Sequence, residues 1–226
     1  LKEMAVALAR ARAQELEQER LRAFRETARK VAHEMRGPLT ATRLAVRRLG
    51  VAGDAEAAGV LVEETRRLEQ MAKAFSEFGR LPEGPAADID IGELLQGAVK
   101  ATVPEETPLR QSVASSLVVQ GHYEPLRRAF QNLLQNAVDA GGPGAVEVRA
   151  EPIEGGVRVV VADSGSGIEP ELRERIFEPY FTTRERGTGL GLALVRQTIV
   201  AHGGTIRAEE SSSGGAAFVV TLPERS

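Results

Sequence analysis

The chain has 226 residues, 42% of them hydrophobic, and a formal net charge of -3 with acidic and basic residues interspersed. This length allows one substantial hydrophobic core and a smaller helical module, so we expect two units. The mixed charges argue against nucleic acid or an anionic membrane as a partner. The absence of cysteine excludes disulfides and thiolate metal sites. No apolar run reaches the ~18 residues of a membrane span, so we expect no membrane contact.

The first 79 residues are predicted to form two helices joined by a short turn. Residues 1–49 are rich in strong helix formers. Apolar residues recur there at steps of three and four, as in a coiled-coil seam: Leu21, Phe24, Ala28, Val31 and Met35. Residues 50–54 break the pattern, and a second helical run follows over 55–79. Because such a hairpin buries little area by itself, we predict a homodimer in which two hairpins form a four-helix bundle.

A linker is predicted at 80–87, where two prolines and a glycine cannot continue a helix or a central strand. The pattern that follows mixes helices and strands over 88–226. Helices are expected at about 91–101, 123–140 and 190–202. Strands are expected near Ile89 and at 117–119, 146–148, 157–162, 205–209 and 216–222. This order predicts an α/β sandwich with its helices on one face of the sheet.

One histidine of the first helix has unusual neighbours. Counting the seam from Leu21 places His33 at the outward f position, so its ring is expected to be exposed. Glu34 puts a carboxylate beside this ring, and Pro38 lies inside the predicted helix. Proline there costs roughly 3 kcal/mol, which a helix tolerates more readily where a bend serves a purpose. A surface histidine on a solvated helix is the plain alternative.

Three further motifs lie in the C-terminal part. Asn132 and Asn136 stand four apart, on one helix face, although a polar surface explains such a pair about as well. Asp163 ends an apolar strand and enters the glycine-containing turn 163–168, a geometry that faces ligands but that other tight turns share. Residues 187–192 (GTGLGL) open a helix, whose backbone N–H groups can bind phosphate oxygens. Glycine packing is the alternative for this last motif.

Together these motifs resemble the sensor histidine kinases of bacterial two-component systems. The string 33–40 (HEMRGPLT) resembles their H-box, and the later motifs follow the order of their N, G1, F and G2 boxes, with 177–183 as the F-box. The resemblance covers nearly the whole chain. It implies a dimerisation and phosphotransfer hairpin over 1–79 and an ATP-binding domain of the GHKL (Bergerat) type over 88–226. It leaves open whether a longer protein is anchored in a membrane, with this chain as its cytoplasmic part.

The resemblance also implies an activity and roles for single residues. The chain would be a protein-histidine kinase that phosphorylates His33 from ATP, with Glu34 accepting the ring proton, and passes the group to the receiver domain of a response regulator. Asn136 would coordinate Mg2+ at the ATP phosphates, with Asn132 close to the same site. Asp163 would accept the adenine amino group. Further nucleotide contacts are implied in the glycine turn, the F-box, a mobile lid over about 169–188 and the last glycine motif: Gly165, Gly167, Ile168, Phe177, Arg184, Arg186, Gly187, Thr188, Gly189, Leu190 and Gly191.

Three positions merit separate expectations. Gly37 stands where many relatives carry the Thr or Asn that positions water for dephosphorylating the partner, so weak phosphatase activity is expected. His122 replaces a common acidic residue and is expected to cap the following helix less well than Asp would. His202 is expected to be a structural residue at the C-terminal end of a helix.

Overall fold

The computed structural model describes residues 36–52, 57–62, 64–66, 68, 85–141, 144–184 and 188–224. The chain divides into two compact units, Leu1–Arg80 and Leu81–Ser226. His33, Glu34 and the predicted coiled-coil seam lie outside the described residues, so these predictions are not tested by the structure. No helix within the described ranges is long and apolar enough to cross a membrane.

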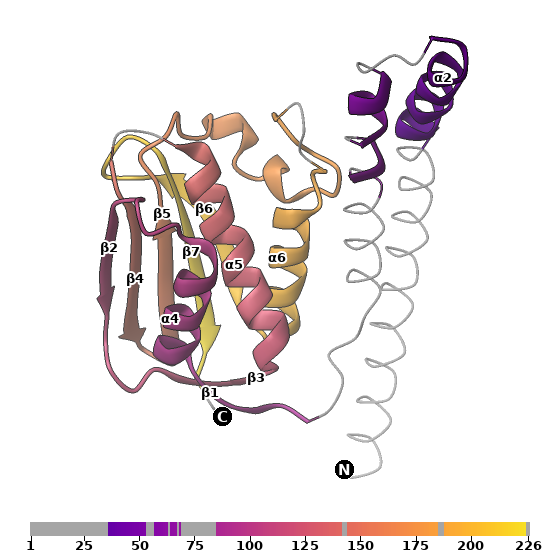
Figure 1. Ribbon diagram of the computed structural model, residues 1–226. Coiled ribbons are helices and arrows are strands. Elements are labelled where there is room, and N and C mark those ends of the chain that lie inside the picture. Colours follow the sequence, from indigo (N-terminus) through magenta and orange to yellow (C-terminus); the bar gives the residue numbers. More distant parts are fainter. Residues whose placement is uncertain are drawn as a thin grey trace. The chain divides into compact units, whose positions relative to one another are not determined.

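The first unit contains α2 (Arg36–Ala52) and further helical residues at 57–62 (Figure 1). The helix α2 continues through Gly50, where we predicted that it would stop. A single glycine inside a helix costs only about 1 kcal/mol relative to alanine, so it need not end one. The described helix therefore extends to Ala52.

The second unit is a sheet covered on one face by helices (Figure 1). The helices are α4 (Ile91–Thr102), α5 (Tyr123–Ala140) and α6 (Gly191–Ala201). The five-stranded sheet has the order β2-β4-β5-β7-β6, with β2 parallel to β4 and the other neighbours antiparallel. Its strands are β2 (Leu109–Val113), β4 (Val146–Ile153), β5 (Gly156–Ala162), β6 (Thr205–Glu210) and β7 (Ala216–Pro223). The predicted α/β sandwich with helices on one face is confirmed.

A separate two-stranded sheet pairs β1 (Ala87–Asp90) with β3 (Val118–Gly121). Helix α4 begins directly after β1 because the side chain of Asp90 caps it. Its Oδ1 accepts hydrogen bonds from the backbone N of Gly92 at 2.7 Å and of Glu93 at 3.2 Å. This cap satisfies N–H groups that have no partner inside the helix.

The core lies between the helices and the sheet. Helix α5 contributes the apolar stripe seen in the sequence, and the central strand β5 contributes alternate valines. The fully or almost fully buried members of these two sets are Leu126, Phe130, Leu133, Leu134, Ala137, Val157, Val159 and Val161. Two short 3-10 turns, η1 (Pro170–Leu172) and η2 (Arg175–Phe177), follow the sheet's central strand in the chain, and η2 also packs against this core.

Candidate functional site

Asp163 follows β5 directly, and its side chain is only 4% exposed. Its Oδ1 accepts hydrogen bonds from the backbone N of Gly165 at 2.9 Å and of Ala216 at 3.1 Å. Among the residues that the structure describes, no hydrogen bond is made to its Oδ2. Burying a carboxylate is costly unless donors compensate it. A carboxylate with one oxygen fixed by the backbone and the other open therefore suits the binding of a ligand N–H group.

The glycines of the Asp163 turn are required by close packing. A Cβ on Gly165 would stand 2.8 Å from the carbonyl oxygen of Ala140, at the end of α5. Gly167 has a φ of +73°, and a Cβ there would stand 3.2 Å from the carbonyl oxygen of Gly214. Larger residues would push this turn away from α5 and from the β6–β7 turn. Close packing thus accounts for both glycines by itself.

Asn132 and Asn136 lie half-buried on α5, flanked by buried leucines on the core side. Neither side-chain amide makes a hydrogen bond to any described residue, so both are free to bind a ligand. Amide oxygens are suitable ligands for Mg2+, which commonly takes its other ligands from water and phosphates. Within the described ranges no group of three or more His, Cys, Asp or Glu could hold a metal ion. These asparagines therefore fit a cation that arrives with a phosphorylated molecule.

Arg184, predicted to meet the phosphates, lies beside the asparagine-bearing part of α5. Its NH1 group is 2.8 Å from Oδ2 of Asp139, and its NH2 group donates to the carbonyl oxygen of Asn136 at 3.1 Å. The structure thus brings this arginine to the residue predicted to hold Mg2+. Arg186 and Gly187 lie outside the described residues.

The start of α6 is open. A Cβ on Gly191 would meet no atom of the described residues within 4 Å, and the preceding Leu190 provides no side-chain cap for the helix. The first N–H groups of α6 are thus reachable by an anion. Gly189 differs, because its φ is +65° and a Cβ would approach the backbone of Tyr180 to under 3.0 Å. The carbonyl oxygen of Gly189 also accepts a hydrogen bond from the Tyr180 N at 2.8 Å.

The apolar side chains of the predicted site point into the core. Phe177 is 4% exposed and packs edge-on against Phe218, with ring centroids 6.3 Å apart. Leu190 is 1% exposed, and Ile168 is partly buried against the same core. These side chains anchor the loops of the site, and those of Phe177 and Leu190 offer almost no free surface to a ligand, whereas Ile168 keeps part of its surface exposed. This anchoring fixes η2 in the core through Ile176 and Phe177, and the lid expected over about 169–188 stays a prediction.

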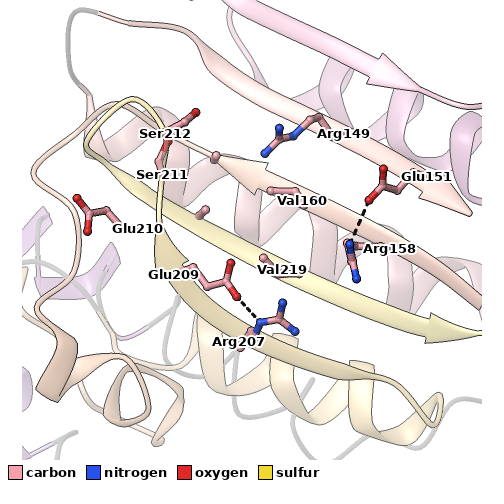
Figure 2. Close-up of a pocket in the computed structure, with 12 residues that line it drawn as sticks. Arg149, Glu151, Arg158, Val160, Arg207, Glu209, Glu210, Ser211, Ser212 and Val219 are labelled. Atoms are coloured by element: carbon pink, nitrogen blue, oxygen red, sulfur yellow. Dashed lines mark hydrogen bonds and ion pairs between the residues drawn. The ribbon is translucent and has the colours of Figure 1, made fainter. Parts of the chain in front are cut away.

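A separate hollow of about 280 Å3 lies on the sheet face opposite the helices (Figure 2). Its floor includes Val160 and Val219, which are neighbours in the β5–β7 pairing. Arginines on its rim pair with glutamates, Arg158 with Glu151 at 3.3 Å and Arg207 with Glu209, which neutralises their charge. The hollow contains none of the predicted site residues. The sequence analysis missed three residues where β6 turns into β7, namely Gly214, Gly215 and Ala216. They contact the Asp163 turn.

The second unit is an α/β sandwich in which the Asp163 turn, the asparagines and Arg184 gather around the C-terminal half of α5. Residues 121–226 match the family described as histidine kinase-, DNA gyrase B- and HSP90-like ATPase. The sensor histidine kinase ZraS of Escherichia coli O157:H7 is 33% identical over 216 residues, which cover 91% of this chain and 47% of ZraS. The chain thus spans about half the length of this relative.

Solved structures agree with this match. The mycobacterial sensor histidine kinase MprB is 32% identical, with a TM-score of 0.57, over 62% of this chain and 98% of that one. The histidine kinase ThkA in complex with the response regulator protein TrrA is 28% identical, with a TM-score of 0.76, over 92% of this chain and 64% of that one. The chain belongs to the sensor histidine kinases, a class of protein-histidine kinases, and its second unit is their GHKL-type ATPase domain. The predicted family is confirmed.

Proposed function

We propose that this chain phosphorylates its own His33 from Mg-ATP and passes the phosphoryl group to an aspartate of a response regulator. The observation that carries the nucleotide part is the buried Asp163, whose Oδ1 is held by two backbone amides while its Oδ2 is open. Adenine presents an exocyclic amino group, a donor that matches this acceptor. Membership of the sensor histidine kinases supports the rest.

In this proposal the second unit binds ATP along α5. Asp163 accepts the adenine amino group at one end. The amide oxygens of Asn136 and Asn132 would hold Mg2+, which offsets negative charge on the phosphates. The open start of α6 at Gly191 and the guanidinium of Arg184 supply donors to the phosphate oxygens. For Arg184 this requires exchanging the Asp139 carboxylate for phosphate, and exposed pairs of this kind contribute only about 0–1 kcal/mol.

The chemical step that we propose is an in-line transfer. A ring nitrogen of His33 forms a bond to the γ-phosphorus while the bond from that phosphorus to the bridging oxygen breaks and ADP leaves. Glu34 accepts the proton of the other ring nitrogen, which keeps the attacking lone pair available. Because His33 and the nucleotide belong to different units, the segment 80–87 acts as a linker that lets them meet. Positioning of the two reactants supplies most of the rate.

The assembly that we propose is a homodimer joined through the helical hairpins, with a receiver domain as the phosphoryl acceptor. The ThkA–TrrA complex supports such an acceptor, since that kinase binds a response regulator. The exposed apolar side chains of the helical residues in the first unit support a further helix packing there: Leu39, Leu44, Val46, Val60 and Val62. Helices with such faces are stabilised by burying them against other helices.

The test is transfer of labelled γ-phosphate from ATP to the chain. The wild-type chain is expected to acquire an acid-labile label, and His33→Gln and Asn136→Ala are expected to abolish it. Gln131→Ala is the matched control, because it removes an amide from the same part of α5 on a different face. His33→Gln should still bind ATP, whereas Asn136→Ala should bind Mg-ATP weakly. Normal ATP binding by the wild-type chain without any label would show a nucleotide-binding scaffold and refute the kinase proposal.

A further inference from the structure

The carboxylate of Asp163 is held in place from a strand that is distant in sequence. β5 and β7 run antiparallel, with Ala162 opposite Ala217. At the end of this ladder the backbone N of Asp163 donates to the carbonyl oxygen of Ala216 at 2.9 Å, and the N of Ala216 donates back to Oδ1 of Asp163 at 3.1 Å. The Ala216 amide is thus one of the two donors that orient this carboxylate.

The residue before this donor must be glycine. A Cβ on Gly215 would lie under 3.0 Å from Oδ1, the carbonyl carbon and the carbonyl oxygen of Asp163. Two of these are backbone atoms, so a side-chain rotation cannot relieve the clash. An alanine there would force Asp163 and the start of β7 apart, and separation lengthens the hydrogen bond from Ala216. The orientation of the Asp163 side chain therefore depends on the absence of a side chain at position 215.

The turn that presents Gly215 is itself fixed. The N of Ser211 donates to the carbonyl oxygen of Gly215 at 2.8 Å, and the N of Gly214 donates to the carbonyl oxygen of Ser211 at 3.0 Å. Ser211 is 7% exposed, and its Oγ accepts a hydrogen bond from the N of Ser213 at 3.2 Å. On the other side, Gly214 lies against the left-handed Gly167. The β6–β7 turn and the Asp163 turn thus form one packed unit.

We propose that Gly215, acting through the Ala216 amide, is a positioning residue for adenine recognition. It holds Oδ1 of Asp163 against the backbone so that Oδ2 faces the adenine amino group. This inference rests on the proposed function, because it assumes that Asp163 binds adenine. It adds the β6–β7 turn to the site as the element that sets the preference for an amino-bearing purine.

The test compares ATP with purine ribonucleoside triphosphate, which lacks the amino group, by measuring dissociation constants on the full chain with Mg2+. The wild-type chain is expected to prefer ATP by about tenfold or more, since hydrogen bonds to charged groups are the strong ones. Gly215→Ala is expected to reduce this preference at least about fivefold. In an Asp163→Asn background the same substitution should cause no further loss, because it acts through that carboxylate.

Gly156→Ala is the matched control. A Cβ there would also lie under 3.0 Å from backbone, the carbonyl oxygen of Leu222, at the opposite end of the same β5–β7 pair. It should lower thermal stability, as Gly215→Ala does, but leave the ATP preference unchanged. Where Gly215→Ala does not fold, replacing Ala216 by lactate exchanges its N–H group for an ester oxygen without adding a side chain at position 215, and the same loss of preference is expected.

The outcomes separate this inference from the proposed function. A wild-type chain that does not bind ATP, or that binds both nucleotides equally, refutes the role given to Asp163 and with it the proposed nucleotide site. A wild-type preference that survives in folded Gly215→Ala or in the lactate variant refutes only the positioning role. An equal loss in Gly156→Ala also refutes it, because the effect would then come from general loosening of the strand pair.

Discussion

The pairing of His122 with His202 makes the stability of the second unit depend on pH. The ring of His202 joins the C-terminal end of α6 to the start of α5. Its Nε2 accepts a hydrogen bond from the backbone N of His122 at 3.0 Å, and its Nδ1 lies 2.7 Å from the carbonyl oxygen of Thr198. A backbone N–H can only donate and a carbonyl can only accept. His202 must therefore be neutral, with its proton on Nδ1.

The direction of the effect follows from the environment of this ring. Burial lowers the pKa of His202 below its ordinary value, and the neighbouring His122 lowers it further, while the bond to the Thr198 carbonyl opposes the shift. Between the folded pKa and about 6.5, the unfolded chain binds more protons than the folded one. Stability is therefore full above about pH 6.5 and is lost as the pH falls through the folded pKa. Losing a hydrogen bond and leaving a half-buried N–H without an acceptor costs about 1–3 kcal/mol.

The variant that isolates this effect is His202→Gln. A glutamine oxygen can reach the position of Nε2 and accept the same N–H group, but it does not titrate. Urea unfolding at pH 8, 7, 6 and 5.5 is expected to show a loss of about 1–2 kcal/mol in the wild-type chain that is absent from the variant. Since His33 and His122 are present in both proteins, the difference between the two pH dependences reports His202. Equal pH dependence in the two proteins would contradict this reasoning.

Three further predictions concern a cap, a core residue and the predicted phosphatase defect. Asp90→Ala should lower the free energy of unfolding of the second unit by about 1 kcal/mol, because the α4 cap is lost. Asp90→Ser should keep most of that stability, and urea titration of the two variants distinguishes these outcomes. Phe177→Ala should lower the free energy of unfolding by about 3–5 kcal/mol because it empties a core position, and Phe177→Leu should lower it much less. A smaller loss in Phe177→Ala would show that η2 is not anchored. Gly37→Thr should accelerate decay of the phosphorylated partner, and rapid decay with the wild-type chain would contradict the expectation of weak phosphatase activity.

Elements with a strong periodic pattern were predictable from the sequence. The range 123–140 was predicted for α5 because its buried stripe repeats at helical spacing, and β5 was predicted from a run of valines that the structure buries at the centre of the sheet. The strand β2 was not predicted. Its residues are mostly exposed at the sheet edge, and it is a strand because it pairs with β4 and not because its own side chains are buried.

The candidate site was predictable only in part, because motifs show residue types but not which contacts they make. Asp163 was identified from its position after an apolar strand, but the donor Ala216 lies 53 residues further on and has no polar side chain to mark it. Phe177 belongs to a motif that resembles a nucleotide-binding box, yet its ring is needed by the core. The link between His122 and His202 spans 80 residues and depends on how two helix ends meet. The roles of His33 and Glu34 stay predictions.

Two glycines of the motif 187–192 differ in whether the packing of the fold explains them. Gly189 is explained by its positive φ and its contact with Tyr180, so a substitution there would disturb the fold whether or not ATP binds. Gly191 has no such explanation in the part of the chain that the structure describes, since a Cβ at this first residue of α6 would meet none of its atoms within 4 Å. Alanine is also the better helix former by about 1 kcal/mol. Gly191→Ala should therefore keep or raise thermal stability while weakening ATP binding, and unchanged ATP affinity would mean that the phosphates do not approach this helix start.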